Sequence, residues 1–285
     1  MNKINLFRFY RMDYCIRNLG LGIMAILTVD SVPNPFNAFL AMIQILLIQM
    51  HSFSTNNYFD HKVWKEDNYI GKLLASNFNQ KILPFLCLAP LLFLAITIPF
   101  SDKYFFLLVL YIFLFSLYQI PPFRNIFKNH YLPSIIINSI CLGTILYLYP
   151  YLYLNKELHL VGFLFSLIFF FYLAFHEVIH QIAHLGQDKI YSLPQAIGIK
   201  KAVKVAISFL IISILVAFYG FVISPLRNFF FSGTIGFSLF RIYKLSKIPL
   251  TKESFLKIKN SWDKFYSLQE GIYYLIVILL IKLWK

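Results

Sequence analysis

Residues 176–197, HEVIHQIAHLGQDKIYSLPQAI, hold the densest group of side chains that could do chemistry. If the first part of this segment is helical, then at about 100° per residue Glu177, Gln181, His184 and Asp188 fall within a stripe roughly 60° wide. The segment ends a long apolar run. Polar side chains on one face of such a helix are costly unless they face water, an ion or a ligand. We therefore expect a functional site where this run ends.

Two further polar clusters also follow apolar runs. Asn56 and Asn57 lie four and three residues before Asp60, so one helical face can present all three side chains. In the second cluster, YQIPPFRNIFK, Arg124 and Lys128 follow a pair of prolines. Mg²⁺ takes carboxylate and phosphate oxygens, and arginine and lysine can neutralise the remaining phosphate charge. These residue types therefore suit a diphosphate bridged by magnesium.

The composition indicates what kind of protein must position these clusters. Of the 285 residues, 59% are hydrophobic and 13% are charged, about half the charge of a soluble domain. We therefore expect an all-α integral membrane protein with nine transmembrane helices in a single bundle around a lateral chamber, forming one polytopic domain over residues 1–285. Spans of about 20 apolar residues are predicted at approximately 14–32, 36–56, 82–100, 103–122, 131–151, 158–180, 203–223, 227–243 and 267–284.

The charges of the connecting segments predict the orientation. Cations gather in the N-terminal tail and in four loops, at about 57–81, 123–130, 181–202 and 241–266. By the positive-inside rule, the N-terminus and the three polar clusters are cytoplasmic, and we expect the cell (plasma) membrane. The net charge of +14 is then explained by the basic loops that set the membrane topology, and no nucleic-acid partner is expected. The basic segment 244–265 is predicted to be amphipathic and to lie on anionic lipid.

The first two clusters resemble the UbiA superfamily of intramembrane prenyltransferases, whose members have nine helices and two aspartate-rich motifs, after the second and sixth helices. Residues 56–60, NNYFD, are similar to the start of the first motif, N-D-x-x-D-x-x-x-D, with Asn57 and Trp64 at acidic positions. Residues 118–128 are similar to the loop after the fourth helix.

The third cluster resembles the second aspartate-rich motif. Residues 177–188 follow its order, with Gln181 and His184 at acidic positions and Asp188 kept, and Ser-Leu-Pro at 192–194 is similar to the Thr-Leu-Pro that follows. The similarity of layout covers nearly the whole chain.

The resemblance implies transfer of an isoprenyl group from an allylic diphosphate to an aromatic or lipid-like acceptor within the lipid bilayer, with Mg²⁺ as cofactor. It implies Asp60, Asp188 and Asn56 as metal ligands, and the same three with His184 as catalytic residues. The residues it implies for binding the diphosphate are Asn57, Lys62, Lys72, Tyr118, Arg124, Lys128, Gln181 and Lys189.

Two other interpretations stay open. Replacing acidic residues by Asn, Gln and His lowers the negative charge that holds Mg²⁺, and imidazole is a poor magnesium ligand. The protein could therefore be a catalytically decayed relative that binds an isoprenoid without turnover. Residues 176–180, HEVIH, also match the H-E-x-x-H pattern of zinc metalloproteases. The sequence does not define the prenyl chain length, the acceptor or the oligomeric state.

Overall fold

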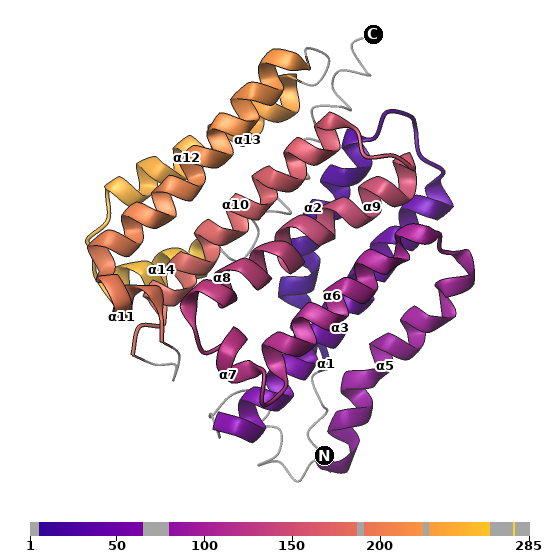
Figure 1. Ribbon diagram of the computed structural model, residues 1–285, viewed down its shortest axis with the longest axis horizontal. Helices are drawn as coiled ribbons and strands as arrows, with labels where there is room; N and C mark the ends of the chain where they lie inside the picture. Colours follow the sequence, from indigo (N-terminus) through magenta and orange to yellow (C-terminus); the bar gives the residue numbers. More distant parts are fainter. Residues whose placement is uncertain (1–5, 65–79, 187–190, 225–227, 263–275, 277–285) are drawn as a thin grey trace.

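The computed structural model describes residues 6–64, 80–186, 191–224, 228–262 and 276, and the regular secondary structure in these residues is helical (Figure 1). Helix η4 is π-helical and joins α8 to α9, whereas η1, η2 and η3 are short 3₁₀ turns. The elements in chain order are α1 Leu6–Phe9, α2 Met12–Thr28, α3 Pro35–Trp64, η1 Gln80–Ile82, α5 Leu83–Ile96, η2 Ile98–Phe100, η3 Lys103–Phe105, α6 Phe106–Gln119, α7 Arg124–Phe127, α8 Tyr131–Asn138, η4 Ser139–Ile145, α9 Leu146–Asn155, α10 Leu160–Ala183, α11 Leu193–Ile197, α12 Ile199–Ile223, α13 Asn228–Ser246 and α14 Lys252–Trp262.

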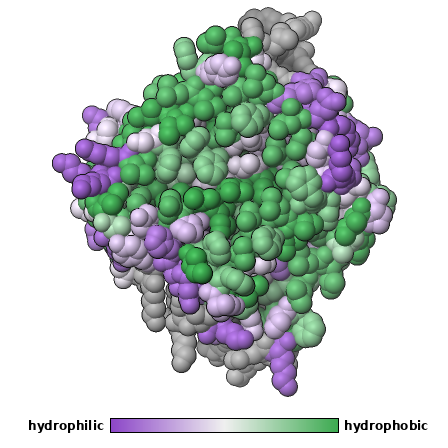
Figure 2. Space-filling model, viewed as in Figure 1, coloured by the Kyte–Doolittle hydropathy of each residue, from purple (hydrophilic) through white to green (hydrophobic). Residues whose placement is uncertain are grey.

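The chain is a multi-pass membrane protein. Within the described residues, five helical stretches are long and apolar enough to cross a bilayer: Pro35–Lys62, Leu83–Phe100, Tyr131–Asn155, Leu160–Ala183 and Ile199–Ile223. The face shown in Figure 2 is mainly apolar, and its hydrophilic residues gather toward the edges. Large side chains such as Phe85, Leu92 and Phe93 are mostly exposed on α5, as expected where a helix faces lipid rather than water.

Helices occupy the first eight predicted span ranges, and the range 267–284 lies outside the described residues except for residue 276. The count of nine spans therefore stays a prediction. Helix α3 continues to Trp64, so Asn57 and Asp60 lie on a helix, as their spacing predicts, and the helix extends beyond the predicted span 36–56 into the range predicted as a loop. The segment contains no Pro or Gly to end the helix.

Helix α10 packs against α12, η4 and α14. It approaches η4 closely at Gly143, where an added Cβ would lie 2.6 Å from the carbonyl oxygen of Phe169. Only glycine avoids this clash, so the residue sets the separation of the two helices. The π-helical turn around it is a feature that often marks functional regions of helices.

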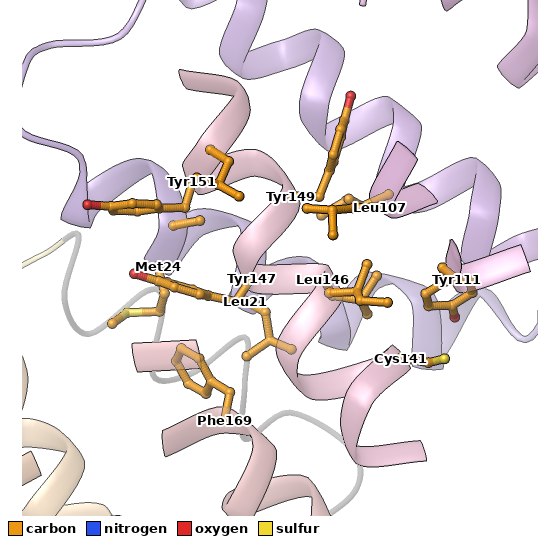
Figure 3. Close-up of a cluster of buried hydrophobic side chains, with 14 of the residues drawn as sticks. Leu21, Met24, Leu107, Tyr111, Cys141, Leu146, Tyr147, Tyr149, Tyr151 and Phe169 are labelled. Atoms are coloured by element: carbon orange, nitrogen blue, oxygen red, sulfur yellow. The ribbon is translucent and has the colours of Figure 1, made fainter. Parts of the chain in front are cut away.

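Three tyrosines of α9, Tyr147, Tyr149 and Tyr151, lie among the buried side chains of the core (Figure 3). Tyr147 and Tyr149 are fully buried. The Tyr147 hydroxyl lies 2.8 Å from Oγ1 of Thr28 on α2, and the Tyr149 hydroxyl donates to Oε1 of Gln44 on α3. The Gln44 amide in turn donates to Thr97 at 2.8 Å. These bonds satisfy polar groups that would otherwise be costly in the membrane interior.

The basic segment 244–265 differs from its expected arrangement. Its later part forms α14, as the helical spacing predicts, but α14 packs against α10. Phe255 is fully buried in a cluster that includes Val178 and Ile182 of α10. The apolar side of α14 at Phe255 therefore covers the protein, because a deep contact on α10 is available to it there, and is not free to lie on lipid.

Candidate functional site

A buried charged cluster forms where α3, α6 and α7 end. The Asp60 carboxylate, 7% exposed, accepts hydrogen bonds at Oδ1 from Arg124 and from Lys128, the latter at 2.5 Å. Its Oδ2 accepts from Nδ2 of Asn56 at 2.8 Å, and the Asn56 carbonyl oxygen accepts from Lys128 at 2.7 Å. Two cations therefore converge on one carboxylate, and the neutral Asn56 amide bridges that carboxylate and Lys128.

Local structure explains why these four residues meet. Asn56 and Asp60 lie four residues apart on α3 and so share one face. After α6 ends, the prolines at 121 and 122 interrupt the helix and the single turn α7 begins at Arg124. Arg124 and Lys128 are again four apart, and the Lys128 amide donates to the Arg124 carbonyl at 2.9 Å. The short turn thus presents both cations on the side that faces α3.

Burial changes the charge behaviour of this cluster. Arg124 is 1% and Lys128 is 6% exposed. Burial lowers the pKa of Lys128 from 10.5 to about 8, although the Asp60 carboxylate acts in the opposite direction. Lys128 is therefore charged at neutral pH but is far easier to deprotonate than a lysine on the surface.

A chain of polar contacts leads from this cluster to α10. The Lys128 ammonium lies 5.6 Å from the centroid of the Tyr118 ring, and the Tyr118 hydroxyl lies 3.4 Å from Oγ of Ser134. Ser134 donates to Oε1 of Glu177 at 3.0 Å, and Asn138 donates to the Tyr118 hydroxyl at 3.3 Å. The end of α3 and the end of α10 are thus joined through side chains of α6 and α8.

Gln181 holds the end of α10 against the start of α11. Its amide nitrogen donates to Glu177 at 3.2 Å, and its Oε1 accepts from the Leu193 amide at 3.0 Å. The Tyr191 amide donates to the Asn129 carbonyl at 3.0 Å, next to Lys128. The three polar clusters predicted from the sequence therefore lie together at one end of the bundle.

Several predicted site residues lie elsewhere or are not described. The amide of Asn57, a predicted diphosphate ligand, donates to the Phe9 carbonyl at 3.2 Å, so this amide group contacts the backbone near α1. Lys62 is exposed and lies 5.8 Å from the centroid of the Tyr58 ring. The His184 ring lies 4.6 Å from that of His180. The predictions for Lys72, Asp188 and Lys189 fall outside the described residues.

Ser134 and Asn138, which were not among the predicted site residues, line the connection between the two motifs. Both are buried, and they lie four residues apart in an apolar helix. Paired polar residues on one face of such a helix were the available signal, by the same reasoning that singled out residues 176–197.

The metal-binding capacity of the site rests on oxygen donors. Within the described ranges, no group of three or more His, Cys, Asp and Glu side chains could hold a metal ion. The His176 ring packs edge-on against the Tyr172 and Phe175 rings, which gives the zinc protease interpretation no support. Asp60 and Asn56 supply carboxylate and amide oxygens, which Mg²⁺ accepts. However, both Asp60 oxygens already accept hydrogen bonds.

Comparison with known proteins gives a match in structure alone, since no protein-family model and no curated protein matches the chain. A UbiA homologue from Archaeoglobus fulgidus bound to GPP and Mg²⁺ superimposes with a TM-score of 0.74 at 15% identity, over 94% of this chain and 98% of the other. The apo UbiA homologue from Aeropyrum pernix K1 gives 0.67 at 14% identity, over 94% and 98%. A structure of digeranylgeranylglyceryl phosphate synthase in membranes gives 0.66 at 12% identity, over 97% and 98%. The resemblance noted in the sequence is thereby confirmed at the level of architecture: the protein has the fold of the UbiA homologues.

Proposed function

We propose that the protein is a UbiA-type membrane prenyltransferase, which moves an isoprenyl group from an allylic diphosphate to a lipophilic acceptor. The observation that carries the proposal is the buried cluster of Asn56, Asp60, Arg124 and Lys128. Buried arginine and lysine side chains at one end of an apolar bundle suit a ligand with a diphosphate head and a hydrocarbon tail. The UbiA homologue with the same fold that binds GPP and Mg²⁺ supports this substrate class.

The two cations would act by exchanging partners. In the free protein, Arg124 and Lys128 donate to Asp60. When a diphosphate enters, its oxygens compete for these donors, and the Asp60 carboxylate is released from them. As the bond between the allylic carbon and the diphosphate oxygen breaks, the electron pair stays on the oxygen. Arg124 and Lys128 then stabilise the leaving charge, the acceptor bonds to the allylic carbon, and the proton that the acceptor loses passes to the departing diphosphate.

Release of Asp60 also supplies a place for a metal. Asp60 and Asn56, with Asp188 beyond the described residues, are the side chains that would hold Mg²⁺, and their oxygens fit this ion. When bound, the ion neutralises charge on the departing diphosphate. Tyr118 lies beside Lys128, so its ring would lie next to the bound diphosphate, where an aromatic face favours nearby positive charge.

The remaining features of the proposal concern the cellular setting. The site end of the bundle would face the cytoplasm and the protein would reside in the plasma membrane, because the basic residues gather at that end. The substrate chain would occupy a lateral chamber open to the bilayer. We further propose that the 285 residues form one domain, since segments distant in the sequence contribute jointly to the site.

A transfer assay with purified protein tests the proposal. Dimethylallyl, geranyl and longer diphosphates are supplied with a total lipid extract, with and without Mg²⁺, and diphosphate release is measured. The wild type should release diphosphate when Mg²⁺ is present, and Asp60→Ala and Lys128→Ala should each lose at least a hundredfold in rate. Lys156→Ala is the matched control, because Lys156 is an exposed lysine that pairs with Asp102 and lies outside the proposed site. Release that is unaffected by Asp60→Ala and Lys128→Ala would reject the site.

A second candidate function is isoprenoid binding without turnover, and Gln181 favours it. At an acidic position of the resembled motif, this residue uses its amide to join Glu177 to the Leu193 backbone, which is a structural use. A protein that is stabilised by a prenyl diphosphate but releases no diphosphate with any chain length would support this alternative.

A further inference from the structure

Two buried amide side chains within the bundle each have an unused polar atom. Asn18 on α2 is 2% exposed and Gln49 on α3 is fully buried. In the described part of the chain, Nδ2 of Asn18 and Oε1 of Gln49 find no hydrogen-bond partner. Their other atoms are engaged locally: the Asn18 oxygen accepts from Arg17 at 3.3 Å, and the Gln49 nitrogen donates to the Ile45 carbonyl at 2.9 Å. One unused donor and one unused acceptor therefore remain.

The packing of α2 on α3 places these two residues at the same level. On one side, the Tyr14 and Phe53 ring centroids are 6.0 Å apart. On the other, a Cβ added to Gly22 would lie 2.6 Å from Cδ1 of Ile45. The helices are thus antiparallel at this contact. Asn18 lies midway between Tyr14 and Gly22, and Gln49 lies midway between Phe53 and Ile45, so the register places the two residues at the same level of the contact between α2 and α3.

The Gln49 side chain also belongs to the face of α3 that forms the charged cluster. Gln49 precedes Asn56 by seven residues and Asp60 by eleven. At about 100° per residue these three side chains lie within roughly 40°, and Gln49 lies about 10 Å from Asn56 along the helix axis. The unused atoms are therefore deeper in the bilayer than the diphosphate site but on the same side of the helix.

An unsatisfied polar atom is expensive in a membrane interior, so two of complementary type at one level point to a ligand. We propose that Asn18 and Gln49 bind the hydroxyl group of the lipophilic acceptor. A hydroxyl is both donor and acceptor: it would accept from Asn18 and donate to Gln49. A carbonyl oxygen would satisfy Asn18 alone. The subsite therefore selects a phenol, hydroquinone or alcohol over the corresponding ketone, quinone or ether. That the occupant is the acceptor rests on the proposed function.

The test compares binding of 4-hexylphenol with that of its methyl ether, 4-hexylanisole, to the full-length protein in detergent by titration calorimetry. The wild type should bind the phenol about tenfold more tightly. Asn18→Leu and Gln49→Leu should each remove most of this preference. Because both changes delete an unsatisfied polar atom, thermal stability should stay the same or rise, which a merely structural role for the amides would not allow.

Gln44→Leu is the matched control, because Gln44 is a fully buried glutamine of the same helix whose amide is satisfied by Thr97, Ser101 and Tyr149. It should lower stability and leave the preference for the phenol intact. Equal binding of phenol and ether by the wild type would overturn the proposal, as would a preference that survives Asn18→Leu and Gln49→Leu.

Binding of geranyl diphosphate to the same variants separates this proposal from the proposed function. The diphosphate should bind Asn18→Leu and Gln49→Leu as it binds the wild type. Phenol selectivity without any prenyl transfer by the wild type would remove the transferase function and leave the hydroxyl subsite standing. Prenyl transfer by a wild type that shows no preference for the phenol would support the transferase function and remove the hydroxyl subsite.

Discussion

Replacing Asp60 by Asn should weaken the free protein and strengthen its response to diphosphate. The Asp60 carboxylate bonds Lys128 at 2.5 Å and also accepts from Arg124. At an effective dielectric constant near 20, one such pair attracts by about 7 kcal/mol, most of which offsets the cost of burying the charges. Removing one partner of a buried pair typically destabilises by about 3–5 kcal/mol, because the other charge stays buried. We expect a loss of this size for Asp60→Asn without ligand.

A diphosphate should restore what Asp60→Asn loses. In the wild type the ligand must first break the bonds from Arg124 and Lys128 to Asp60, whereas in the variant these donors meet the phosphate oxygens without that competition. Recovery of even 1.4 kcal/mol corresponds to tenfold tighter binding. Thermal unfolding in detergent, with pyrophosphate added in the presence of EDTA, should therefore show a larger stabilisation of Asp60→Asn than of the wild type. Magnesium-dependent turnover should fall in the same variant.

Asp102→Asn provides the control. Asp102 pairs with the exposed Lys156 at 2.6 Å and accepts from the Tyr104 amide at 2.9 Å, a bond that an asparagine oxygen can keep. Its loss should cost less than about 1 kcal/mol and should not alter the response to pyrophosphate. If pyrophosphate stabilises Asp60→Asn no more than it stabilises the wild type, the cations do not bind the diphosphate and the partner-exchange mechanism is wrong.

Three further outcomes are expected. Burial lowers the pKa of Lys128 to about 8, so its ammonium group is charged below that pH and loses its charge above it. Pyrophosphate titrations should therefore show an affinity that falls by up to tenfold per pH unit above pH 8. An affinity that stays constant up to pH 10 would contradict the role of Lys128 in binding the diphosphate. Gly143→Ala should lower the stability measured by thermal unfolding by about 1–3 kcal/mol, because the added Cβ would meet the Phe169 carbonyl oxygen. Gly236→Ala is the control: this glycine has open space around it, so the change should be neutral or stabilising by up to about 1 kcal/mol. Phe255→Ala should cost about 3–5 kcal/mol and release α14 from α10, which faster amide exchange in α14 would reveal; unchanged exchange would show that another contact holds the helix.

Membrane insertion and most helix positions follow from the sequence alone, because they depend on local properties. A run of apolar residues long enough to cross a bilayer must be helical to satisfy its own backbone, so hydropathy locates it without knowledge of its neighbours. The grouping of the three polar clusters at one end likewise follows, because alternating spans return the chain to the same side. The sequence therefore predicts that Asp60, Arg124 and Lys128 share one site in which opposite charges meet.

Tertiary structure decided which partner each polar side chain takes. Asn56 and Asn57 are neighbours in the sequence, yet one bonds Asp60 and Lys128 and the other bonds the Phe9 carbonyl, because a step of about 100° turns them toward different helices. Gln181 likewise found a backbone partner across a turn.

That Asn18 and Gln49 lie at one level follows from the register of α2 on α3, which the Tyr14–Phe53 and Gly22–Ile45 contacts fix. Hydropathy determines where each helix lies along the membrane normal. Its rotation and its neighbours are set by packing between segments far apart in the chain, and no local pattern encodes that.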